Sequence, residues 1–118
     1  MPTKYNNAKV EYDGHRFDSK KEMRRYMVLR EWQRRGDIRD LCCQVRFILV
    51  HGQKKRATNG HEVKRRERSY IADFTYYDRD GHFHVEDVKG YKGGKAYELF
   101  TLKTALMLEN YGIEVEEV

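Results

Sequence analysis

A predicted β-hairpin in the second half of the chain constrains the fold most strongly. Tyr70–Tyr77 is rich in aromatic and β-branched residues, which favours a strand, and His82–Lys89 is a second strand-like run. The four residues between them, Asp78-Arg79-Asp80-Gly81, are typical of a turn. The apolar character of the first run indicates a buried strand, yet that run contains an aspartate, Asp73. Asp is disfavoured in strands, and a buried carboxylate without a partner is costly. Asp73 therefore needs a specific explanation.

The length of the hairpin loop decides what lies beside Asp73. A two-residue loop would put Asp73 opposite Val88, whereas a three-residue loop would put it opposite Asp87. Only the second register places Asp73, Asp87 and Lys89 on one face of the sheet. Like charges directly opposite each other destabilise a hairpin, and a divalent cation is the obvious counter-charge. We therefore predict the three-residue loop.

Two carboxylates and a lysine on one face suit the metal-assisted hydrolysis of a phosphodiester. Mg²⁺ is commonly held by one or two carboxylates together with water and substrate phosphate. Lys89 would orient or deprotonate the attacking water, or stabilise the charge that grows on the phosphate. A solvated strand edge with a salt bridge is the alternative interpretation of the same residues.

Two helices and further strands are predicted around this hairpin. The first helix is expected over 20–35, because Ser19 and Glu22 have the spacing of a capping box and Gly36 suits its C-terminus. The remaining predicted elements are a hairpin within 10–17, a strand at Leu41–Val50, a helix at 96–111 with Leu99, Leu102, Leu106 and Met107 on one face, and a strand at Ile113–Val118.

Glu22 admits two interpretations. As the third residue of a helix it completes a capping box and needs no other role. It also lies in line with Tyr26 and Leu29, so its carboxylate could reach the metal-binding face of the sheet. We expect these two roles to compete with each other.

The charge balance favours a polyanionic partner. The 118 residues carry 24 Lys and Arg against 19 Asp and Glu, a net charge of +5, and their number fits one domain spanning 1–118. A basic loop is expected at 51–69, where it could grip DNA or remain solvated, and a Gly-rich loop near residue 93 could also approach phosphates. The candidate DNA-binding residues are Lys54, Lys55, Arg56, Lys64, Arg65, Arg66, Arg68, Lys92 and Lys95. The histidines match no zinc-binding signature.

The location is expected to be a reducing cytoplasm. No apolar run is long enough to span a bilayer, and the first twelve residues lack the apolar core of a secretory signal. Cys42 and Cys43 are adjacent and form no disulfide framework.

These residues together resemble the PD-(D/E)XK nuclease superfamily. The resemblance rests on the segments 17–22, 70–74 and 85–90, together with Gln44, and covers the chain roughly from residue 4 to residue 118. More closely, the chain is similar to small phage-encoded proteins of an unknown-function domain family, related to RecU-type Holliday junction resolvases and the TnsA endonuclease. The fold that the resemblance implies is α/β: a restriction-endonuclease-like αβββαβ core with a mixed central sheet flanked by two helices, here with an N-terminal β-hairpin (1–17).

The resemblance also implies site residues. Asp73 and Asp87 match the two metal-binding acids of the superfamily, Lys89 its lysine and Glu22 the acid on its first helix. Gln44 and Lys103 match assisting positions, although an edge polar residue and a surface lysine explain them equally well. The superfamily often has proline before the first acid, where this chain has alanine.

The activity implied is that of a Mg²⁺-dependent DNA endonuclease in which Mn²⁺ substitutes. A structure-selective or nicking enzyme, resolvase-like and involved in DNA recombination, is favoured over a restriction enzyme, because so small a chain has little surface for reading bases. A two-fold homodimer is a reasonable assembly for such an enzyme. The setting implied is a phage-encoded protein in the cytoplasm of a bacterial host. The alternative is a non-catalytic DNA-binding protein, or a phage accessory protein, on the same fold.

Overall fold

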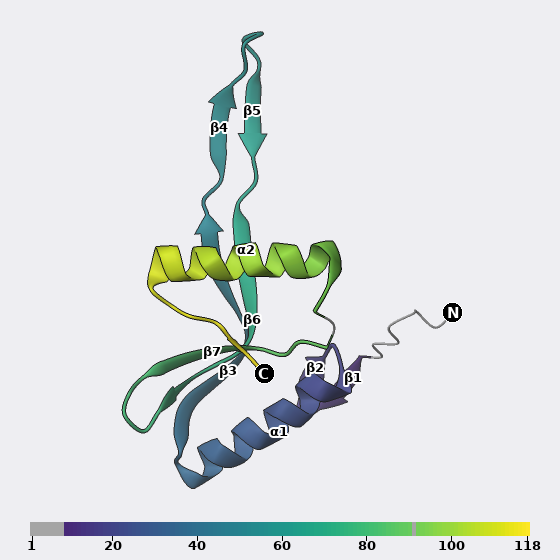
Figure 1. Ribbon diagram of the computed structural model, residues 1–118, viewed down its shortest axis with the longest axis vertical. Coiled ribbons are helices and arrows are strands. Elements are labelled where there is room, and N and C mark those ends of the chain that lie inside the picture. The colour runs from purple at the N-terminus through teal and green to yellow at the C-terminus, as the bar shows by residue number, and fades with distance from the viewer. Residues whose placement is uncertain (1–8, 91) are drawn as a thin grey trace, which may run out of the picture.

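The structure is a computed structural model that describes residues 9–90 and 92–118. Within these residues the chain forms a mixed α/β fold with two helices, a four-stranded sheet and two two-stranded ribbons (Figure 1). The elements are β1 (Val10–Tyr12), β2 (His15–Phe17), α1 (Lys20–Arg35), β3 (Ile38–Val50), β4 (Gln53–Arg56), β5 (Glu62–Arg65), β6 (Arg68–Asp78), β7 (Phe83–Asp87), α2 (Gly94–Tyr111) and β8 (Glu116–Glu117).

The main sheet has the order β3-β6-β7-β8. Its first three strands pair antiparallel, and β8 pairs parallel with β7, so the sheet is mixed as predicted. No helix in the described residues is long and apolar enough to cross a membrane.

The predicted order of elements is confirmed, and helix α1 has the predicted bounds. The Ser19 hydroxyl accepts the backbone N–H of Glu22 at 3.2 Å, and Gly36 ends the helix with a φ of +83°. The predicted N-terminal hairpin is the β1–β2 ribbon, while residues 1–8 of that prediction lie outside the described residues.

The basic segment between β3 and β6 is an ordered ribbon where a loop was predicted. Strands β4 and β5 pair over four residues each and extend away from the two helices (Figure 1). Every residue of the two strands is exposed. We call residues 53–65 the basic arm.

The last two strands of the sheet are shorter than predicted. Strand β7 ends at Asp87, because the next backbone N–H, that of Val88, donates to the Asp73 side chain at 2.8 Å. Lys89 therefore lies beyond the strand. Strand β8 contains only Glu116 and Glu117, since Ile113 and Val115 pack against the core near α2 and do not join the ladder.

The core has two clusters, one for each helix. The cluster of α1 contains Phe17, Tyr26, Leu29, Ile38, Phe74 and Tyr76. The cluster of α2 contains Leu49, Tyr70, Ala72, Val85, Phe100 and Met107.

The predicted buried face of α2 is wrong in part. Phe100 and Met107 are its buried residues, while Leu99 and Leu102 are 52% and 57% exposed. The helix is apolar on more than one side, so periodicity alone does not identify the side that meets the sheet.

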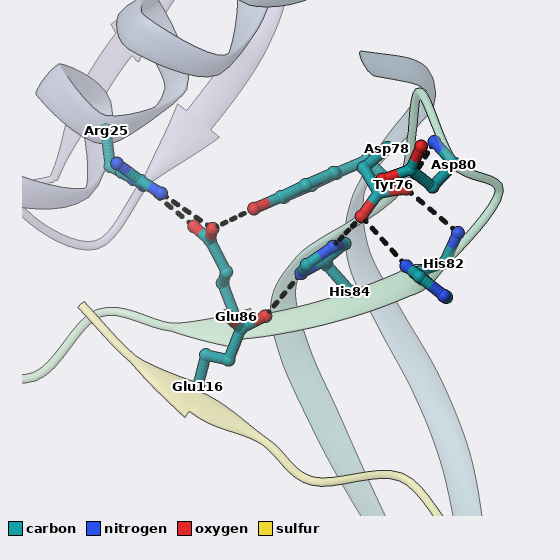
Figure 2. A network of polar contacts seen from close by, with 8 residues as sticks. All are labelled: Arg25, Tyr76, Asp78, Asp80, His82, His84, Glu86 and Glu116. Carbon is teal, nitrogen blue, oxygen red and sulfur yellow. Dashed lines mark hydrogen bonds and ion pairs between the residues drawn. The ribbon is translucent and has the colours of Figure 1, made fainter. Parts of the chain in front are cut away.

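A buried ion pair joins α1 to the sheet. Arg25 donates to both carboxylate oxygens of Glu86, at 2.8 and 2.7 Å, and the Tyr76 hydroxyl donates to the same carboxylate (Figure 2). Glu86 is 1% exposed, so its charge depends on these donors.

Replacing Arg25 should destabilise the protein more than an ordinary surface change. Arg25→Met leaves a buried carboxylate without its cation, which costs about 3 kcal/mol. Arg34→Met is the matched control, since Arg34 pairs with exposed Glu31 and should cost less than ~1 kcal/mol. Urea unfolding measures both variants, and equal losses would show that the Arg25–Glu86 pair contributes nothing special.

Candidate active site

A cavity of about 960 Å³ lies where the start of α1, the centre of the sheet and the start of α2 meet. Its lining combines acidic, basic and amide side chains with backbone from both helix starts. The lining residues are Asp18, Ser19, Lys21, Glu22, Gln44, Ile71, Asp73, Asp87, Val88, Lys89, Gly90, Gly93, Gly94, Lys95 and Ala96. Glu22, Gln44, Asp73, Asp87 and Lys89, which the sequence singled out, all line this one cavity.

The β6–β7 register is the one that the three-residue loop predicts. The backbone N–H of Asp78 donates to the carbonyl of His82 at 2.9 Å, and Phe74 pairs with Glu86. The same register continued by one residue puts Asp73 opposite Asp87. The two carboxylates therefore come from adjacent strands at the point where β7 ends.

Each of these aspartates is held by a neutral donor. Asp73 accepts the backbone N–H of Val88 at 2.8 Å, and Asp87 accepts the Tyr70 hydroxyl at 2.6 Å. Asp87 is almost completely buried. These bonds fix the orientation of both carboxylates, and each leaves an oxygen for another partner.

Lys89 lies against Asp87. Its ammonium is 3.0 Å from Asp87 Oδ1 and 3.7 Å from the centre of the Phe100 ring. The ring face and the carboxylate restrict the lysine to the inner side of the cavity. A positive charge is thus fixed beside the two acids.

Glu22 contacts both the start of α1 and the polar side chains of the site. Its Oε2 accepts the backbone N–H of Asp18 at 3.2 Å at the start of α1, while its Oε1 accepts the Gln44 amide at 2.9 Å. One oxygen thus helps to cap the helix and the other faces the site. A carboxylate has two oxygens that can serve different partners, so the contact at the helix start leaves the other oxygen directed to the site.

Gln44 connects the acid of α1 with that of the sheet. Its amide nitrogen also approaches Asp73 Oδ1 at 3.4 Å. Gln44 has a φ of +54° in the middle of β3, a conformation that non-glycine residues rarely adopt. Strained backbone of this kind often occurs at functional sites, where it directs a side chain.

The site raises the pKa of two of its acids. Burial, together with the charge of nearby Asp73, raises the pKa of Glu22 to about 7. Burial likewise raises the pKa of Asp73 to about 6, assisted by the charge of Asp87 and opposed by the Val88 N–H and Lys89. Negative charge is therefore concentrated where little water compensates for it.

The chemistry of these donors fits a hard divalent cation. Mg²⁺ binds carboxylate oxygens, and a cation would offset the burial and the like-charge repulsion that raise both pKa values. The carboxylate oxygens of Glu22, Asp73 and Asp87 do not all lie within 4.8 Å of one another. The three acids alone therefore do not enclose a cation. Water molecules and substrate oxygens, which Mg²⁺ usually retains, would complete such a site.

Among the described residues, a group whose possible ligand atoms do lie within 4.8 Å of one another is found in the β6–β7 turn. It consists of Asp78, Asp80 and His82. Asp78 Oδ1 accepts two backbone N–H groups of the turn, and its Oδ2 faces His84 Nε2 at 2.8 Å (Figure 2). The hydrogen bond with His84 lowers the pKa of Asp78 to about 2. Asp78 is thus already occupied by the turn, and the cluster is explained without a metal.

The structure places some of the other predicted site residues at the cavity and others away from it. Lys95 lines the cavity, whereas Lys92 and Lys103 are absent from its lining. Lys92 lies 3.9 Å from Glu117, at the C-terminal strand. The positions of Lys92 and Lys103 therefore give no support to roles at this cavity. The remaining predicted DNA-binding residues belong to the basic arm, except Arg66 in the connection that follows it and Arg68 at the start of β6.

Two residues of the site were not predicted from the sequence. Tyr70 was taken as part of an apolar strand, but its hydroxyl holds Asp87. Lys21 was treated as part of a helix start, but it lines the cavity and its ammonium donates to the Lys89 carbonyl. No local pattern identifies either residue, because each role depends on a partner far away in the sequence.

The raised pKa of Asp73 makes folding stability depend on pH. Its ionised form is disfavoured in the folded state, so the protein should lose stability as pH rises through about 6 when no divalent cation is present. At pH 8 in EDTA, Asp73→Asn should be more stable than the wild type by on the order of 1 kcal/mol, since partial exposure reduces the effect. At pH 3, below the ordinary pKa of 3.8, Asp73 is protonated in both the folded and the unfolded state, so the difference should disappear.

Urea unfolding at the two pH values measures this effect. Asp80→Asn removes an exposed carboxylate from the same hairpin and is the control. A loss of stability in Asp73→Asn at pH 8 would contradict the assignment of Asp73 as an electrostatically unfavourable acid.

Comparison with protein families gives one match. A family model described as "Protein of unknown function (DUF1064)" matches residues 2–112. Neither the curated proteins nor the solved structures contain a match. Because the family model covers nearly the whole chain, this protein belongs to the DUF1064 family.

Proposed function

We propose that this protein is a metal-dependent endonuclease that hydrolyses phosphodiester bonds in DNA, with a PD-(D/E)XK type of site. The observation that carries the proposal is the meeting of Glu22, Asp73, Asp87 and Lys89 in one cavity, from α1, β6 and the end of β7. Apart from the β1–β2 ribbon and the basic arm, the elements follow the order α-β-β-β-α-β, which agrees with the core of that superfamily.

The acids supply the binding site for the cation. Asp73 and Asp87 would hold Mg²⁺, with Glu22 as a further ligand, and Tyr70 and the Val88 N–H keep the two aspartates in place. When bound, the cation would polarise the scissile phosphate and lower the pKa of a water molecule. Gln44 holds Glu22 and Asp73 in their present orientations.

Lys89 is suited to act on the attacking water or on the phosphate. Its ammonium already lies beside Asp87, so it can donate a hydrogen bond to an oxygen in the cavity without a large movement. Its positive charge would also stabilise the negative charge that grows on the phosphate during attack. Lys21, on the same cavity wall, can contact a neighbouring phosphate of the strand.

The basic arm supports a nucleic-acid substrate. Lys54 and Lys64 are directly opposite each other in the β4–β5 ladder, an arrangement that destabilises a ribbon unless an anion is bound. Neither strand of the arm buries a residue, so its side chains contribute nothing to a core. A two-stranded ribbon fits the major groove of B-form DNA.

Cleavage should require both the cation and the acids. Supercoiled plasmid and a four-way junction should be cut in Mg²⁺ or Mn²⁺ and left intact in EDTA. Asp87→Ala and Lys89→Met should each reduce the cleavage rate by roughly 10²-fold or more, since each removes a group in contact with the reacting atoms. Gel electrophoresis of the products measures the rates, and the preferred DNA indicates the subclass.

Asp80→Ala serves as the control, because it removes a carboxylate outside the cavity. A wild-type protein that binds DNA without cutting either substrate in either cation would refute the nuclease. That result would favour the alternative of a non-catalytic DNA-binding protein, in which the basic arm would still contact DNA.

Charge removal from the arm should weaken DNA binding in a salt-dependent way. Lys54→Gln with Lys64→Gln should reduce affinity several-fold near 100 mM salt and lower the slope of log Kd against log salt by about 2. Arg34→Gln with Arg35→Gln, at the far end of α1, is the control and should change the slope less. Fluorescence anisotropy with a labelled duplex measures the affinity and the slope. If the arm variant has the same slope as the wild type, the arm does not contact DNA.

A further inference from the structure

Helix α2 carries an apolar stripe on the side turned away from the sheet. Leu99 and Leu102 are 52% and 57% exposed, and Leu106, one turn further on, is only partly buried. Their spacing of three and four residues puts them on one line along the helix. In Figure 1, α2 crosses in front of the strands near the base of the basic arm. Contiguous exposed apolar residues of this kind mark interaction sites.

Two exposed charges lie at the ends of the same stripe. Lys95 is seven residues before Leu102 and Glu109 is seven residues after it. Seven residues are close to two full helical turns, so the three side chains lie nearly in line. Leu102 is therefore the midpoint of a line that begins with a positive charge and ends with a negative one.

Both charges are unfavourable with respect to the dipole of their own helix. The first turn of α2 has no acidic residue and its last turn has no basic residue. Lys95 instead lies near the positive N-terminal end and Glu109 near the negative C-terminal end. Each such placement is electrostatically unfavourable, so the isolated chain gains nothing from this charge order.

We infer that the exposed stripe of α2 binds a second copy of this chain, with the two α2 helices antiparallel about a two-fold axis at Leu102. In this arrangement Lys95 faces Glu109 of the other copy, and each charge lies beside the helix end that stabilises it. The two-fold axis forms this contact twice, and it packs Leu99 and Leu102 between the two helices. An acidic or basic partner of another kind would match only one end of the stripe.

The contact is a helix pair of modest size. Eighteen residues make a helix about 27 Å long, and contacts of this extent are at the low end of stable interfaces. We expect dimerisation with a Kd of micromolar order. The dimer rests on α2 alone and does not require that the protein be a nuclease.

Analytical ultracentrifugation from 1 to 200 µM tests the inference. The wild type should shift from 14.2 kDa towards twice that mass as its concentration rises. Leu102→Glu should remain a monomer throughout. Leu108→Glu is the matched control, because Leu108 is 53% exposed on the same helix but lies about 120° around its axis from Leu102. Leu108→Glu should dimerise like the wild type.

A charge exchange tests the antiparallel geometry itself. Lys95→Glu and Glu109→Lys should each weaken the dimer at least several-fold, because each creates two like-charge contacts. The chain carrying both substitutions should recover wild-type dimerisation. Circular dichroism confirms that each variant is folded. A wild type that stays monomeric at 200 µM, a Leu102→Glu variant that still dimerises, or a double variant that does not recover would each overturn the inference.

Discussion

The pairing of β6 with β7 controls everything that the candidate site can do. A three-residue turn fixes the register in which Asp73 and Asp87 oppose each other, and a shift by one residue would send one of them to the other side of the sheet. The same register directs Glu86 to the side of α1, where Arg25 holds it. One turn thus positions both the acids of the cavity and the ion pair that secures the first helix.

The cavity is acidic at its centre and basic at its edges. Asp73, Asp87 and Glu22 lie among neutral donors, namely Tyr70, Gln44 and a backbone N–H, and these orient the acids without neutralising them. Among the acids of the cavity, Asp87 contacts the ammonium of Lys89 directly. Such a site places carboxylates with little compensating solvent beside the positive charge of Lys89. The raised pKa values of Glu22 and Asp73 reflect this arrangement.

Much of this could be predicted from local sequence. The turn Asp78–Gly81 indicated the register, and Ser19 with Gly36 marked the ends of α1. Asp73 was identified because a carboxylate is unusual in a buried strand, and Asp87 and Lys89 because the predicted register puts them on the same face. Glu22 was identified from its line with the buried side of the first helix. Gln44 was identified from the resemblance alone. The mixed α/β fold with two helices was likewise predicted.

The rest depended on contacts between distant segments. The buried side of α2 could not be predicted, since leucines occur on several sides of the helix and only the sheet selects Phe100 and Met107. The ordered arm was predicted as a loop because its strands have no apolar alternation. The role of Tyr70 depends on a residue that lies seventeen positions away.

The central claim is that the acids of the cavity hold a divalent cation, and the most direct test is to locate that cation. A crystal grown with Mn²⁺, measured for anomalous scattering, should show an ion within about 2.5 Å of carboxylate oxygens of Asp73 and Asp87. A peak confined to the turn at Asp78, Asp80 and His82, or no peak at all at saturating Mn²⁺, would contradict the account.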